Sequence, residues 1–239
     1  MRMVVVAFAW ATAAGAAGRE DREREYDAKL RTELEAMAPA AVPLWDAASA
    51  ARERKDLDAA VEAFRGVIAA APKFDAAHRR LCRVENAQGH RADAVPECRE
   101  AMRLADNAAN GSALAFVLVD GSADEKDEAR RLASSWAPRA AAEAELELIC
   151  QVALQVDDGD TFDTCARRLL DADPGGVAAN YFGFIDSFAR ERWGEARTRL
   201  DRARVAGLPP DLYAKMSGQL DEREPKLPRL LALLGWAVA

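Results

Sequence analysis

One small apolar residue recurs at a nearly constant interval through the middle of the chain. The successive intervals are 34, 35, 33 and 34 residues, and the residue follows an acidic or glycine-containing turn. The members of the series are Ala60, Ala94, Ala129, Phe162 and Ala196. A fixed period of this length is typical of repeats that each form one pair of helices. The pattern therefore predicts about five helical hairpins over residues 41–208.

Other features fall into the same register. When the recurrent residue is placed at position 20 of a repeat, Pro72 and Pro174 both fall at position 32, where proline ends one helix and precedes the next. The abundant Ala, Leu, Glu and Arg favour helices, whereas runs of β-branched residues are scarce. We expect an all-α protein in which each hairpin buries its apolar face by stacking on its neighbours.

The best-preserved copy of this pattern resembles the tetratricopeptide repeat. From Lys55 to Pro72 it presents a turn, an aromatic-or-leucine position, an alanine, an aromatic and a closing proline in the family's order, and residues 89–95 and 192–197 repeat part of it. The resemblance implies a right-handed α-solenoid with capping helices at both ends. Its five degenerate repeats span 41–74, 75–108, 109–142, 143–176 and 177–208. The family's Leu-Gly pair is largely absent, but the small residues that replace it, such as Ala48 and Cys82, still allow close packing.

The amino terminus has the pattern of a secretory signal. A basic start at Arg2 precedes an apolar run from Val4 to Ala17 that ends in small residues. We expect a signal peptide over residues 1–18, cleaved at Ala14-Gly15-Ala16 or one residue later, and a periplasmic or secreted protein. The alternatives are an uncleaved membrane anchor and a cytosolic apolar terminus.

Helices are also predicted on both flanks of the repeats. Residues 19–40 are polar and helix-prone, with Tyr26, Leu30 and Leu34 spaced four apart, which is typical of a capping helix or a mobile mature terminus. After the repeats, Pro209-Pro210 opens a predicted carboxy-terminal capping helix over 209–224.

The chain then continues into an apolar tail over residues 225–239. A membrane-spanning helix needs about 20 apolar residues, so this tail alone is too short to cross a bilayer. It either packs on the last repeat, lies at a membrane surface through 227–239, or begins a span that continues beyond Ala239. In the third case Lys226 and Arg229 flank the membrane.

Four cysteines occupy two equivalent pairs of positions. Cys82 and Cys150 stand at position 8 of a first helix, and Cys98 and Cys165 stand at positions 24 and 23 of the second helix. Positions 8 and 24 face one another inside a hairpin. In an oxidising compartment this predicts the disulfides Cys82–Cys98 and Cys150–Cys165, whereas in the cytosol the same positions would hold buried thiols.

The sequence contains no recognisable motif for catalysis or metal binding. It has neither a phosphate-binding glycine loop nor a zinc-protease or serine-hydrolase signature. His78 and Cys82 lie four apart, but their spacing matches no closed zinc site, and the acidic turn at 157–160 lacks the ligands of a calcium loop. We therefore expect no enzyme activity, no metal and no cofactor.

Surface binding is the remaining candidate function. The net charge is −7 and the basic residues form no block, which argues against a nucleic-acid partner. In tetratricopeptide-like arrays, positions 2, 5, 9 and 12 of the first helices line the concave face. Here the predicted protein-binding groove consists of Trp45, Arg52, Arg79, Arg83, Asn86, Gln151, Tyr181, Ile185 and Phe188. Arginine and aromatic side chains suit a peptide or a partner helix, although Trp45 and Phe188 equally suit the ends of a core.

The sequence thus favours a non-catalytic scaffold of the cell envelope that binds a protein or peptide in the concave face of its repeat array. The family's Lys and Asn pattern for a peptide's carboxy-terminal carboxylate is not matched, so that ligand is not predicted. The alternative is the exported sensor or adaptor region of a larger membrane-bound enzyme, for example a peptidase, whose catalytic part lies outside this chain.

Overall fold

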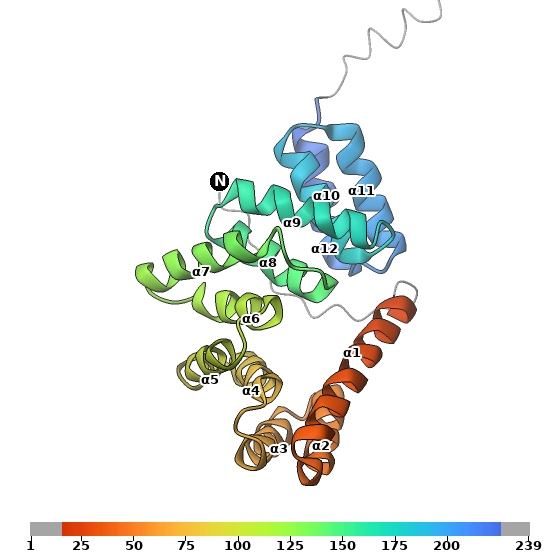
Figure 1. The fold of residues 1–239 in the computed structure, drawn as a ribbon. Helices are drawn as coiled ribbons and strands as arrows, with labels where there is room; N and C mark the ends of the chain where they lie inside the picture. The colour runs from red at the N-terminus through yellow and green to blue at the C-terminus, as the bar shows by residue number, and fades with distance from the viewer. Residues whose placement is uncertain (1–15, 226–239) are drawn as a thin grey trace, which may run out of the picture.

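The computed structural model of the protein describes residues 16–225, within which the chain forms twelve α-helices, one short 3₁₀ helix and no strand (Figure 1). Ten of the helices form five consecutive hairpins, which fall in the predicted repeat intervals except that α6 begins at Ala108, one residue before the third interval. The hairpins are α2 (Val42–Glu53) with α3 (Leu57–Ala70), α4 (Asp75–Ala87) with α5 (Arg91–Leu104), α6 (Ala108–Leu118) with α7 (Ala123–Trp136), α8 (Glu143–Gln155) with α9 (Gly159–Ala172), and α10 (Val177–Ala189) with α11 (Trp193–Val205). The predicted all-α repeat architecture is confirmed.

The recurrent small residue marks the place where paired helices meet. Its four alanines, one in each of α3, α5, α7 and α11, are fully buried, and Phe162 takes the equivalent place in α9. A methyl side chain lets the two helix backbones approach closely, so the 34-residue period follows from packing. The buried residues form two clusters, a smaller one from α1 to α4 and a larger one from Cys82 of α4 to α12.

A left-handed backbone turn also repeats with this period. Lys55, Gly89, Asp157 and Glu191 have φ angles of 61°, 81°, 55° and 57°, and each ends the first helix of its hairpin. In all four turns the next amide donates to a carbonyl five residues earlier, at 2.8–3.0 Å. This is the Schellman pattern, which satisfies carbonyls at a helix end. The third hairpin instead uses a capping box between Ser122 and Glu125.

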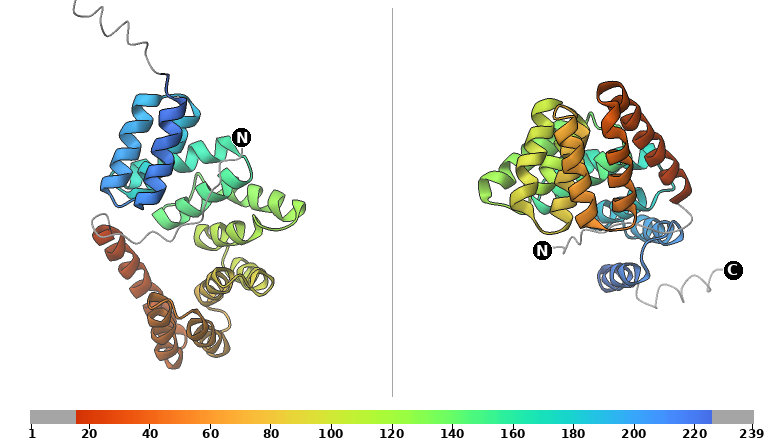
Figure 2. Two further views of the ribbon diagram at one scale, coloured as in Figure 1. Left: turned by 180° about the vertical axis from the view of Figure 1, so that it is seen from behind. Right: turned by 90° about the horizontal axis from the view of Figure 1, so that it is seen from below.

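The helices flanking the array differ in how they pack. The helix α12 (Pro210–Arg223) buries Leu212, Met216 and Leu220 against the end of the array and lies beside α11 (Figure 2). At the other end α1 (Ala16–Met37) is followed by the 3₁₀ helix η1 (Pro39–Ala41). Most of the polar segment 19–40 is therefore helical, and α12 occupies the place predicted for the carboxy-terminal cap.

Two terminal predictions fall mainly outside the described residues. The signal peptide over 1–18 lies there except for its last three residues, which begin α1. The apolar tail also lies outside from residue 226 onward, so its contact with a membrane stays a prediction. Among the described helices, none combines the length and the apolar character that crossing a membrane requires.

Both predicted cysteine pairs are joined in the structure. The Cys82–Cys98 disulfide links α4 to α5, with Cα atoms 5.4 Å apart, and Cys150–Cys165 links α8 to α9, with Cα atoms 5.6 Å apart. All four side chains are buried. Each bridge therefore fastens the two helices of one hairpin together. The first lies where the two hydrophobic clusters adjoin, because Cys82 belongs to the larger cluster and its neighbour Leu81 to the smaller.

Loss of the first bridge should destabilise the protein measurably. The Cys82→Ala/Cys98→Ala variant should unfold with a free energy about 3 kcal/mol lower than wild type, because a closed loop of about 15 residues no longer restricts the unfolded chain. Urea denaturation followed by circular dichroism measures this difference. Dithiothreitol opens both bridges of the wild type, so it should lower the free energy of unfolding by more than the double substitution does. Equal stability of variant and wild type would contradict the prediction.

The left-handed turns give a second prediction. Lys55→Gly should raise the free energy of unfolding by about 0.5–1 kcal/mol, because relief of the strained backbone outweighs the added entropy of the unfolded chain. Gly89→Ala should lower it by about 1–2 kcal/mol. The added methyl meets no atom within 4 Å, so the loss comes from the left-handed backbone, which alanine adopts at a cost. Thermal and urea unfolding of both variants check the opposite signs. Destabilisation by Lys55→Gly would contradict the argument.

Candidate functional site

The first helices of the hairpins line the inner face of the curved array, and α1 crosses the open side of this curve (Figures 1 and 2). Its carboxy-terminal end packs beside α2. Its amino-terminal half reaches the fourth hairpin, where Arg22 donates to Glu143 at 2.6 Å and to Asp173 at 3.0 Å. Both carboxylates raise the pKa of Arg22, the hydrogen bond to Glu143 most strongly. The helix thus bridges two hairpins that are distant in sequence.

Arg79 on α4 lies beneath α1 and is held by hydrogen bonds on two sides. It is only 5% exposed; its Nη1 donates to Asn110 Oδ1 at 2.8 Å, and its Nη2 donates to the Tyr26 hydroxyl at 2.8 Å. Its guanidinium carbon lies 5.8 Å from the centre of the Tyr26 ring. Asn110 is fully buried and donates to the carbonyl oxygens of Ala101 and Ala105. The guanidinium is therefore fixed from below by the array and closed from above by α1.

Asp27 supplies the negative charge at this crossing. Its carboxylate accepts hydrogen bonds from Arg52 on α2, at 3.0 Å, and from Arg80 on α4. Arg80 is only 8% exposed, so its charge depends on a nearby acceptor. Burial raises the pKa of Asp27, whereas Arg52, Arg79 and Arg83 oppose this shift. The arginines of the first two hairpins thus converge on one carboxylate of α1.

The structure brings part of the predicted groove together. Arg52, Arg79 and Arg83 gather around Asp27, with Asn86 half-buried one turn further along α4. Gln151 on α8 is nearly buried. Phe188, at the end of α10, is half-buried against Phe184 and Trp193.

Three of the proposed groove residues are instead parts of the core. Trp45 is 2% exposed and packs edge-on against Phe64 and Phe74. Tyr181 and Ile185 are buried within the larger hydrophobic cluster. Their assignment to the groove is corrected: large apolar side chains at these positions fill space between helices instead of facing a partner.

The prediction also missed residues that complete the crossing. Tyr26 and Asp27 fall outside the predicted groove because α1 precedes the repeats, and Arg80 falls outside it because it lies one place beyond a lining position. The available signal was the row of Tyr26, Leu30 and Leu34, which proves to be the face that α1 turns toward the array. Asn110 offered no signal, since its role depends on contacts 31 residues away along the chain.

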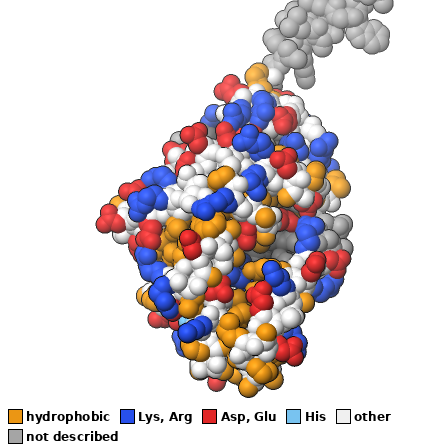
Figure 3. Space-filling view, in the orientation of Figure 1, with side chains coloured by type: hydrophobic (Ala, Val, Ile, Leu, Met, Phe, Trp, Pro, Cys, Tyr) orange, Lys and Arg blue, Asp and Glu red, His pale blue; other side chains and the backbone are white. Residues whose placement is uncertain are grey.

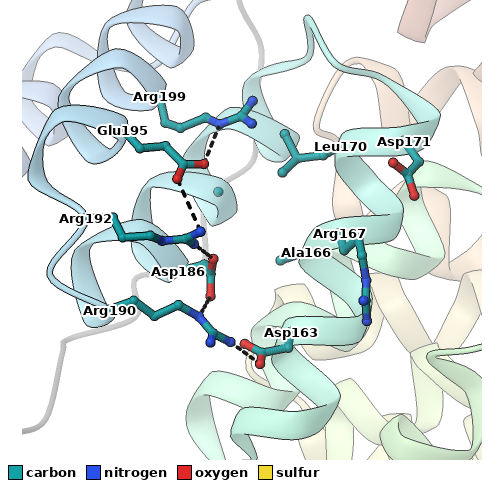
Figure 4. Close-up of a pocket in the computed structure, with 11 residues that line it drawn as sticks. Asp163, Ala166, Arg167, Leu170, Asp171, Asp186, Arg190, Arg192, Glu195 and Arg199 are labelled. Carbon is teal, nitrogen blue, oxygen red and sulfur yellow. Dashed lines mark hydrogen bonds and ion pairs between the residues drawn. The ribbon is translucent and has the colours of Figure 1, made fainter.

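A separate depression of about 410 Å³ lies among α9, α10 and α11 (Figure 4). Its charged side chains pair in a chain. Arg190 contacts Asp163 and Asp186, Arg192 contacts Asp186 and Glu195, and Arg199 reaches Glu195 at 3.7 Å. The lining residues include no histidine, cysteine or hydroxyl side chain. Guanidinium groups hold its carboxylates at 163, 186 and 195. The depression is therefore better suited to binding a charged group that exchanges into these ion pairs than to acid–base catalysis.

Solved structures with a similar fold include tetratricopeptide repeat proteins. A tetratricopeptide repeat protein from Parabacteroides merdae aligns with a TM-score of 0.55 and 14% identity over 76% of this chain and 72% of that one. YrrB, described as a TPR protein with an unusual peptide-binding site, aligns with 0.50 and 15% over 86% and 100%. MamA aligns with 0.50 and 17% over 66% and 93%. No protein-family model and no curated protein matches the sequence.

The protein therefore has the tetratricopeptide-like helical repeat fold that its sequence period predicted. At sequence identities of 14–17% the comparisons establish the fold alone, so any inference about binding depends on the residues of the concave face.

His78 is an ionisable group on α4 whose spacing from Cys82 matches no closed zinc site. Its Nδ1 lies 2.6 Å from Glu97 Oε2 and its Nε2 lies 3.0 Å from the Pro72 carbonyl oxygen. Two acceptors favour an imidazole with protons on both nitrogens. The hydrogen bond to Glu97 raises the pKa of His78, and burial opposes this shift. The described residues contain no cluster of His, Cys, Asp and Glu with metal-binding geometry.

This arrangement predicts a stability contribution that depends on pH. Because the folded pKa of His78 is raised, its contribution is complete below about pH 6.5, the unfolded value, and is lost as pH rises through the folded pKa. His78→Gln should lower the free energy of unfolding by about 1–2 kcal/mol at pH 6 and by less at pH 9. Urea denaturation at both pH values measures this. The exposed His90, mutated to Gln, is the matched control and should show little change; a His78 effect that grows with pH would contradict the assignment.

Proposed function

We propose that the protein is a non-catalytic scaffold of the cell envelope that binds a protein or peptide partner through the concave face of its repeat array. The observation that carries this proposal is the arginine cluster of α2 and α4, defined here as Arg52, Arg79, Arg80 and Arg83, which faces the open side of the curve. Arginine is enriched among residues that dominate binding energy at interfaces. Burying guanidinium groups costs free energy, so a cluster serving stability alone is poorly explained.

The fold supports a scaffold role in two further ways. Stacked hairpins present an extended, preformed surface, which lowers the ordering cost of binding. YrrB, a structural neighbour, is described as having a peptide-binding site. On the face drawn in Figure 3, charges of both signs are interspersed.

The envelope location rests on two independent features. The amino terminus carries the predicted signal, whose apolar run extends from Val4 to Ala17. The two bridged hairpins need an oxidising compartment to keep their disulfides, and such compartments include the periplasm and the extracellular space.

Site-specific photo-crosslinking tests the proposal directly. A photoreactive phenylalanine analogue at Arg83, on the concave face, should give discrete crosslinked proteins in the native envelope, because a bound partner lies within reach. The same analogue at Glu62, exposed on the second helix α3, is the matched control and should not give these products. The amino terminus of the recovered protein should lie near residue 17. No product at 83, or the same products at both positions, would contradict binding through this face.

A further inference from the structure

The two halves of α1 are held in different ways. In its carboxy-terminal half, Leu30 and Leu34 are buried in the smaller hydrophobic cluster. In the half that precedes Leu30, every side chain from residue 21 that the structure describes is exposed or half-buried. The carboxy-terminal half is thus part of the core, whereas the other half lies on the array from outside.

The outer half is fastened mainly by polar contacts, beside the packing of the Tyr26 ring near the Arg79 guanidinium. These are the ion pairs of Arg22 with the fourth hairpin, the hydrogen bond between Tyr26 and Arg79, and the ion pairs of Asp27. The partly exposed ion pairs of Arg22 contribute about 0–1 kcal/mol each, and no described side chain from residue 21 to 29 is fully buried to add a large apolar contribution. An isolated helix of this length is also marginal in water. The contacts of Arg22 therefore resist release weakly, whereas breaking the largely buried Asp27–Arg80 ion pair dominates its cost, and a partner that supplies a carboxylate to Arg80 removes that cost.

The surface beneath this half requires a carboxylate. Within the described part of the chain, Asp27 is the carboxylate that pairs with Arg52 and Arg80. A guanidinium cannot shed its charge at neutral pH, so lifting α1 leaves Arg80 without its ion pair. Arg79 loses the Tyr26 hydroxyl but keeps Asn110. The uncovered site is therefore ready for an acidic group beside an aromatic one.

We propose, building on the binding function above, that residues 21–29 of α1 occupy the partner's site and that the partner displaces them with a helical segment of the same chemistry. That segment carries an aspartate or glutamate over Arg52 and Arg80, an aromatic side chain one place earlier over Arg79, and a basic residue one turn before that. The basic residue takes the place of Arg22 between Glu143 and Asp173. The spacing follows from α1 itself, where Arg22, Tyr26 and Asp27 make these contacts.

The test uses the full chain and one synthetic probe. The probe is a peptide of residues 19–29, blocked at both ends so that its acidic side chains supply its only carboxylates. A lactam between Glu25 and Lys29 holds it helical, since both side chains are exposed. The chain variant Asp27→Asn loosens α1, and Glu25→Gln is the matched control that removes an exposed carboxylate from the same helix.

Hydrogen exchange first reports whether α1 is released. Amides of residues 20–29 should exchange at least about tenfold faster in Asp27→Asn than in wild type, because the helix loses its contact with two arginines. Glu25→Gln should match the wild type. Equal exchange in Asp27→Asn and wild type would overturn the proposed fastening.

Fluorescence anisotropy then measures binding of the probe. It should bind Asp27→Asn at least about tenfold more tightly than wild type, because the tethered helix otherwise competes at a high effective concentration. A probe with Asn in place of Asp27 should lose this binding. If α1 is released but the probe binds no better, the inference fails; crosslinking at Arg83 would then still support the broader function. A wild-type dimer that becomes monomeric in Asp27→Asn would instead identify a second copy as occupant and overturn the proposal.

Discussion

No hairpin of this chain can shield its own apolar face from water, and the rest of the structure depends on that constraint. Stacking is the way each pair buries its inner surface, and the small residues at the helix crossings set how closely the pairs approach. The left-handed turns at Lys55, Gly89, Asp157 and Glu191 return the chain at the same point of four repeats. The disulfides then fasten two of these hairpins internally.

Stacking also creates the binding surface. Hairpins that curve leave an inner face lined by first helices, and polar groups on that face are partly withdrawn from water. Arg79 and Arg80 are buried there and need partners that the array supplies only in part. The helix α1 provides the rest through Tyr26 and Asp27. The same contacts that complete the folded chain thus describe what an external ligand would have to offer.

The sequence predicted those features that the repeat makes periodic. The hairpins and both cysteine pairs follow from the register, because equivalent positions meet in equivalent places. The assignment of Trp45, Tyr181 and Ile185 to the groove was wrong because a position in the repeat gives the direction of a side chain but does not say whether other residues bury it. The contact between Tyr26 and Arg79 joins residues 53 apart and involves a helix outside the repeats, so periodicity could not reveal it.

If α1 lies across the concave face of the stacked array and yields it to a partner, the distance from α1 to the array must change when the partner binds. The most direct measurement is the distance between spin labels on exposed positions of α1 and α9, such as Glu25 and Arg167, by pulsed electron resonance, with labels that spare the disulfides. The account predicts one narrow distance distribution for the protein alone and a broad one after the partner binds. A broad distribution without any partner, or a narrow one unchanged by it, would contradict the account.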